Sequence, residues 1–123
     1  MTGKQYADQI CAWAQVLVGS VLENPFGPET AVFKVGGKIF ALVALDAEEY
    51  VTVKVEPDEG LALRAQYGFV REGYYMNKRH WITIDLGPNV PMPEVRELIE
   101  SSHDLVVATL SKKLRTELGL AAT

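Results

Sequence analysis

Apolar residues recur every three or four positions near the start of the chain, at Tyr6, Ile10, Trp13, Leu17 and Val21. This spacing places them on one stripe of an amphipathic helix. Thr2 followed by Gln5 matches a capping box, so the helix is expected to run from about Gly3 to Leu22. The segment "ENPFGPET" that follows contains two prolines and a glycine, which predict a loop.

The next pattern changes to that of strands. "AVFKVGGKIFALVAL" predicts a hairpin that turns at Gly36 and Gly37, because paired glycines adopt the positive φ angles of tight turns. A third strand is indicated further on, where valines at alternate positions are separated by Thr52 and Lys54. The three strands predict an antiparallel meander with one buried face.

The second half of the chain returns to helical patterns around a further strand region. Pro57, with acidic residues directly after it, predicts the start of a helix that ends at Gly68. "YYMNKRHWITIDL" predicts one or two strands, and "GPNVPMP" precedes a helical C-terminal region. Ser101 and Asp104 resemble a second capping box, so this region is expected to divide into two helices near Ser102.

The order of elements is therefore helix, three strands, helix, two strands, and one or two helices. It predicts an α+β fold in which an antiparallel sheet packs against helices. Nothing in the chain resembles a linker, so we expect residues 1–123 to form one domain.

Charge and composition narrow the class of protein. The chain has 12 Lys and Arg against 16 Asp and Glu, a net charge of −4, which argues against coating nucleic acid by bulk charge. Any basic patch must be local. Cys11 is the only cysteine and no leader pattern is present, so a reducing cytoplasm is expected. The longest apolar run, Ile39 to Leu45, is too short to span a bilayer, and we expect no membrane insertion.

The most distinctive chemistry lies between Asn77 and Trp81. Alternation places Trp81 on one strand face with Arg79, Thr83 and Asp85. It places His80, Ile82, Ile84 and Leu86 on the opposite face. One interpretation is a sheet face whose tryptophan and nearby cations stack on a base or pack against a peptide. The other is that helices cover Trp81, while Lys78 and Arg79 are solvated charges at a strand end.

Other chemistries find little support. The metal-ligating residues Cys11, His80 and His103 are isolated in sequence, and the acidic turn from Asp46 to Glu49 lacks the pattern of a calcium loop. Ser101 and Ser102 beside His103 do not face it on a helix, and Cys11 has the surroundings of a small buried apolar residue. We therefore expect no metal, no cofactor and no catalytic residues.

Three segments together, "FKVGGKIFAL", "YYMNKRHWITIDL" and "LIESSHDLVVATLSKKLR", resemble the MmcQ/YjbR-like family of small bacterial proteins. The resemblance covers nearly the whole chain. It implies an α+β fold similar to that of type III secretion chaperones, and it brings a DNA-binding label common in the family. It also implies a set of shared polar positions, at Lys34, Lys38, Asn77, Lys78, Trp81 and Ser102. His103 stands where the family usually has tyrosine.

Two hypotheses follow. In the first, the chain is a non-enzymatic DNA-binding protein in which Lys34, Lys38, Lys78 and Arg79 neutralise phosphates, and Trp81 or Asn77 contacts bases or sugars. In the second, it is a module for a peptide or small ligand, acting as a homodimer instead of a monomer. Convergence of the four cations on one face would favour the first.

Overall fold

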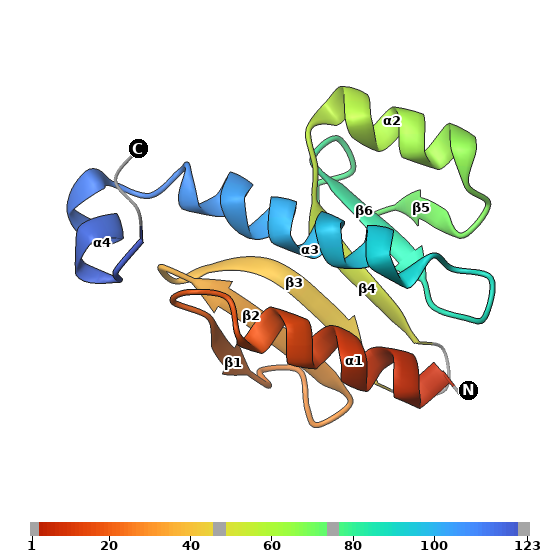
Figure 1. Cartoon of the computed structure of the whole chain (residues 1–123), viewed down its shortest axis with the longest axis horizontal. Helices are drawn as coiled ribbons and strands as arrows, with labels where there is room; N and C mark the ends of the chain where they lie inside the picture. The colour runs from red at the N-terminus through yellow and green to blue at the C-terminus, as the bar shows by residue number, and fades with distance from the viewer. Residues whose placement is uncertain (1–2, 46–48, 74–76, 121–123) are drawn as a thin grey trace.

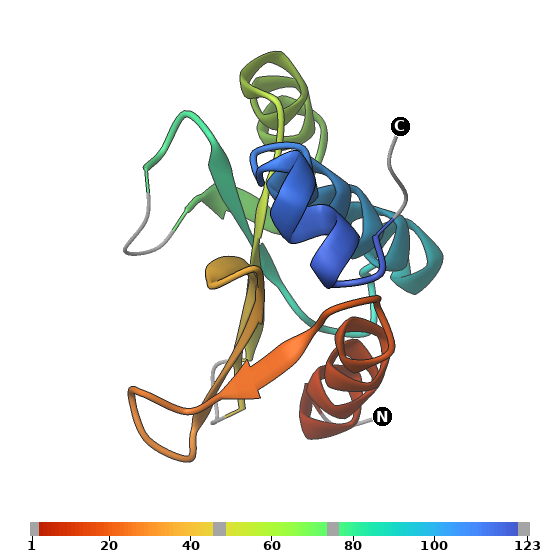
Figure 2. The same cartoon turned by 90° about the vertical axis from the view of Figure 1, so that its left-hand side faces the viewer.

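The computed structural model describes residues 3–45, 49–73 and 77–120, and it confirms the α+β class. A six-stranded antiparallel sheet carries helices on one face, as Figures 1 and 2 show. The helices and strands follow one another along the chain as α1 (Gly3–Gln15), β1 (Val21–Glu23), β2 (Thr30–Val35), β3 (Lys38–Ala44), β4 (Tyr50–Lys54), α2 (Pro57–Gln66), β5 (Val70–Glu72), β6 (Trp81–Asp85), α3 (Met92–Val107) and α4 (Lys112–Glu117).

The strands lie in the order β1-β2-β3-β4-β6-β5. The predicted hairpin is confirmed: β2 pairs with β3, and Gly36 and Gly37 have φ angles of 59° and 80° at the turn. β4 extends the meander and then pairs with β6, so that Val51 lies opposite Ile84. This register puts the apolar residues of four strands on one face, because neighbours across a ladder share a side of the sheet.

The core lies between that face and helices α1 and α3. Ile10 of α1 and Ile99 of α3 are fully buried, as are Phe33, Val51 and Ile84 of the sheet. Burying a side chain of this size contributes roughly 1.5–3 kcal/mol. Figure 2 shows α1, α3 and α4 on the same side of the sheet, whereas loops project from the other side.

The first helix is shorter than predicted. It ends at Gln15, and Val21 begins a short edge strand that the helical spacing concealed. Gly19, at φ 76°, lies in the turn between them, where the Ser20 amide donates to the Leu17 carbonyl at 3.0 Å. Thr2, and with it the proposed capping box, lies outside the described residues, as do residues 46–48 of the acidic turn.

The C-terminal region divides at a different place from the one predicted. α3 continues through Ser102 to Val107, and the break falls at residues 108–111. The capping serine is Ser111, whose hydroxyl accepts a hydrogen bond of 3.1 Å from the Leu114 amide. α2 ends at Gln66, two residues before the predicted limit.

None of the described helices is long and apolar enough to cross a bilayer. In the same part of the chain, no three His, Cys, Asp or Glu side chains gather closely enough to hold a metal ion.

Candidate functional site

Strands β3 and β4 separate at one end, and the sheet forks there. Their pairing runs from Ala44 opposite Tyr50 to Ala41 opposite Val53 and then stops. A bulge contributes to the fork: Phe33 lies opposite Ala41 but Lys34 lies opposite Ile39, so Phe40 is an extra residue in β3. Figure 1 shows the C-terminal half of α3 passing across the gap between the two strands.

Ser102 of α3 bridges the fork. Its hydroxyl donates to the Phe40 carbonyl at 2.6 Å and accepts from the Lys54 amide at 2.8 Å. These two backbone groups have lost their strand partners, and a buried backbone group left unpaired is costly. Ser102 is fully buried. The structure thus gives the shared polar position Ser102 a role in joining two strands.

The fork leaves a cleft of about 350 Å³, which we call the fork cleft. It is lined by Lys38, Ile39, Lys54, Trp81, Val106 and Thr109. Residues of β3 form one wall, Lys54 and Trp81 form the other, and the end of α3 lies between them. This volume is at the lower end of the ~300–1,000 Å³ typical of small-ligand sites.

The cleft is positively charged. Its lining, taken from the described residues, has two lysines and no carboxylate, imidazole or thiol. Neither Lys38 nor Lys54 lies within ion-pair distance of a described acidic residue. Lys38 donates to the Thr109 hydroxyl at 3.0 Å, which uses one of the three protons of its ammonium group. Lys34, by contrast, lies 3.4 Å from the carboxylate of Glu23.

Trp81 begins β6 and is half-buried. Its neighbours across the ladder are Lys54 on β4 and Gly73, whose amide donates to the Trp81 carbonyl at 3.0 Å. A Cβ at position 73 would lie 2.5 Å from that of Trp81, so this position requires glycine. The predicted parity is confirmed for Ile82 and Ile84, which are core residues. It is wrong for His80, which is exposed and precedes the strand.

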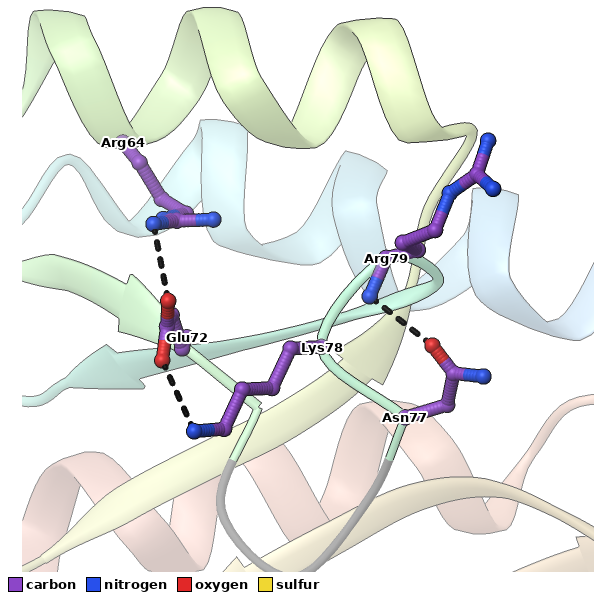
Figure 3. A network of polar contacts seen from close by, with 5 residues as sticks. All are labelled: Arg64, Glu72, Asn77, Lys78 and Arg79. Carbon is purple, nitrogen blue, oxygen red and sulfur yellow. Dashed lines mark hydrogen bonds and ion pairs between the residues drawn. The ribbon is translucent and has the colours of Figure 1, made fainter.

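Lys78 and Arg79 belong to a different surface. Asn77 closes the turn that carries them: its side-chain oxygen accepts from the Arg79 amide at 2.9 Å, as Figure 3 shows. Lys78 lies 3.3 Å from the carboxylate of Glu72, which also binds Arg64 at 3.2 Å. Lys78 and Arg79 line a second cleft, of about 290 Å³, with residues of α2. Of the four predicted cations, only Lys38 lines the fork cleft, and Lys78 and Arg79 line the second cleft.

Comparison with known proteins places the chain in a family. The family model described as YjbR matches residues 16–105. The chain belongs to the YjbR family. Among its relatives, Escherichia coli O157:H7 YbdF is 41% identical over 90 residues, 72% of this chain and 74% of that protein. Escherichia coli K12 YjbR is 30% identical over 83 residues, 67% of this chain and 70% of that protein. Both names describe uncharacterized proteins.

Solved structures agree with this placement. The crystal structure of Deinococcus radiodurans protein DR2400 has a TM-score of 0.86 at 34% identity, over 93% of this chain and 88% of that one. A Pseudomonas syringae protein has a TM-score of 0.70 at 27% identity, over 80% of this chain and 97% of that one. The residues matched by the YjbR model include Lys38, Lys54, Trp81 and Ser102 of the fork.

His103 and Cys11, considered above as possible metal ligands, both lie in structural positions of this YjbR-family protein. The Nε2–H of buried His103 donates to the Val18 carbonyl at 2.7 Å, and its ring meets that of Phe40 edge-on at 5.1 Å. It thereby joins α3 to the segment after α1. Burial, with a smaller effect from Asp8, raises the pKa of the Cys11 thiol to about 11, so this cysteine stays protonated at neutral pH.

Lys54 is the charged residue of the fork cleft that was not among the predicted site residues. Alternation had placed it opposite the core valines of its strand, and that was the available indication. Its position beside Trp81 depends on the pairing of β4 with β6, which joins residues 27 positions apart, Lys54 and Trp81. Such non-local pairing leaves no local pattern in the sequence.

Proposed function

We propose that this YjbR-family protein is a non-enzymatic DNA-binding protein and that the fork cleft is its contact site. The observation that supports this is the combination of Lys38 and Lys54, both without a described carboxylate partner, beside the half-buried indole of Trp81. Lysines neutralise phosphates, and aromatic rings stack on bases. The lining offers ammonium groups, a hydroxyl and an indole, a set suited to binding more than to proton transfer.

The local character of the charge fits the composition. With a net charge of −4, DNA must be attracted by a limited region and not by the protein as a whole. Lys34 and Lys78 are each paired with a glutamate and contribute less to such a region. The contact therefore involves few phosphates, and its affinity should be modest and should fall as salt is added.

The test is fluorescence anisotropy of labelled DNA with the full chain at low and physiological salt. Lys38→Gln/Lys54→Gln is compared with Lys112→Gln/Lys113→Gln, which removes the same charge from exposed positions outside the cleft. We expect the first double variant to lose binding and the second to retain most of it. Equal loss in both variants, or no complex at low salt with the parent, would refute the proposal.

A second candidate function, binding of an extended peptide, is favoured by a different observation. Strand β1 is an edge strand with every residue exposed, and Val21, Leu22 and nearby Phe26 are 54%, 45% and 68% exposed. A peptide could pair with this edge and cover the apolar side chains. Leu22→Lys should then abolish capture of labelled apolar peptides, whereas Lys54→Gln should not. A light-scattering monomer that captures no peptide contradicts this candidate.

A further inference from the structure

We infer that the fork cleft accommodates one unpaired nucleotide, with its base against Trp81 and its phosphate held by Lys38 and Lys54. This inference rests on the proposed function and specifies the form of nucleic acid. The first argument concerns the indole. Trp81 lines a concave wall between Lys54 and Gly73, instead of projecting from a loop. An aromatic ring in that position can stack on a base only if the base has left its duplex.

The second argument concerns the lysines. Lys38 begins β3 and Lys54 ends β4, so the two lysines belong to opposite walls of the fork cleft. A phosphate that enters between them meets two cations and no described carboxylate. Lys38 keeps protons for a ligand beyond the one that it gives to Thr109. Ser102 of α3 fixes the width of the fork, because its hydroxyl forms hydrogen bonds with the backbone of both strands.

The third argument is size and charge together. A duplex presents phosphates over a long surface, and proteins that bind one use extended rows of cations. Here the cations divide between two clefts, and Lys78 on the second cleft is paired with Glu72. A cleft of about 350 Å³ matches a compact ligand. The shared chemistry is a planar base joined to a phosphate, which either a single strand or a free nucleotide supplies.

The experiment measures binding of three probes to the full chain: a short oligothymidylate, the same strand annealed to its complement, and free thymidine monophosphate as competitor. We expect the single strand to bind at least about tenfold more tightly than the duplex. Trp81→Ala should lose about tenfold in affinity for the single strand and Trp81→Phe much less, because one stacked base contributes roughly that factor. Trp13→Phe, remote from the cleft lining, is the matched aromatic control.

Salt dependence supplies an independent readout. One neutralised phosphate on a single strand predicts a slope of about −0.7 in log affinity against log salt, and Lys54→Gln should make this slope shallower. A slope unchanged by Lys54→Gln, or equal loss in Trp81→Phe and Trp81→Ala, would overturn the inference.

The remaining outcomes separate the inference from the proposed function. Duplex bound as tightly as the single strand overturns the inference and leaves DNA binding in place. Monophosphate that competes as well as the oligonucleotide supports the single-nucleotide cleft but removes DNA as its ligand. If none of the three probes binds at low salt, both the inference and the proposed function are wrong.

Discussion

Ser102→Ala should destabilise the protein far more than loss of one surface hydroxyl. Two backbone groups depend on Ser102: the Phe40 carbonyl, at 2.6 Å in a fully buried residue, and the Lys54 amide, at 2.8 Å in a half-buried one. A buried group left unpaired costs about 1–3 kcal/mol, and water from the cleft can partly compensate the second. We therefore expect a loss of about 2–3 kcal/mol in the free energy of unfolding.

The neighbouring Ser101→Ala is the matched control, because Ser101 is exposed on the same helix. It should stay within about 0.5 kcal/mol of the parent. Urea unfolding followed by tryptophan fluorescence measures both variants, and hydrogen exchange of the Lys54 amide reports the bond itself. If Ser102→Ala unfolds at the same urea concentration as Ser101→Ala, and the Lys54 amide remains as protected as in the parent, then Ser102 does not hold the fork together.

Three other predictions concern the cleft wall and the cysteine. Gly73→Ala should destabilise the protein by about 1–3 kcal/mol in a thermal melt, because the added Cβ would meet the Trp81 backbone. Gly68→Ala, whose Cβ would have nothing within 4 Å, should be near neutral, and equal melting temperatures for the two variants would contradict the packing argument. Trp81→Ala should lower the free energy of unfolding by only about 1–2 kcal/mol, because the ring is half-buried outside the core, and Lys78→Ala should leave it nearly unchanged. A loss above about 3 kcal/mol in Trp81→Ala would mean that Trp81 has a mainly structural role. Alkylation of the Cys11 thiol should be slow at pH 8 and should accelerate as the pH approaches about 11; fast labelling at neutral pH would contradict the raised pKa. Because the thiol ionises near 9.0 in the unfolded chain, the free energy of unfolding should fall as the pH rises from about 9 to 11.

The elements that sequence predicted well are those with local causes. The hairpin at Gly36 and Gly37 follows from the φ angles that only glycine adopts easily, and the start of α2 follows from Pro57. The end of α1 was missed because Leu17 and Val21 continue the helical spacing by coincidence. Gly19, which takes a positive φ angle in the turn between α1 and β1, was the local indication that the helix does not continue to Leu22.

The candidate site was only partly predictable. Lys38 and Trp81 were identified, but their proximity comes from a bulge at Phe40 and from the register of β4 with β6. Ser102 was identified as a shared polar position, but its role in joining two strands was not predicted. Its partners lie 62 and 48 positions away along the chain, so no local pattern distinguishes a serine that bridges strands from one that caps a helix.

The two edges of the sheet differ, and this limits how copies of the protein can associate. Both edge strands have three residues, but β5 ends in Arg71 and Glu72, which form ion pairs with Asp85 and with Arg64. The β1 edge exposes Val21 and Leu22 instead. Growth of an open fibril by edge pairing requires two receptive edges on every copy. Because only the β1 edge is apolar, copies are expected to pair β1 to β1 alone, and such an assembly closes after two copies.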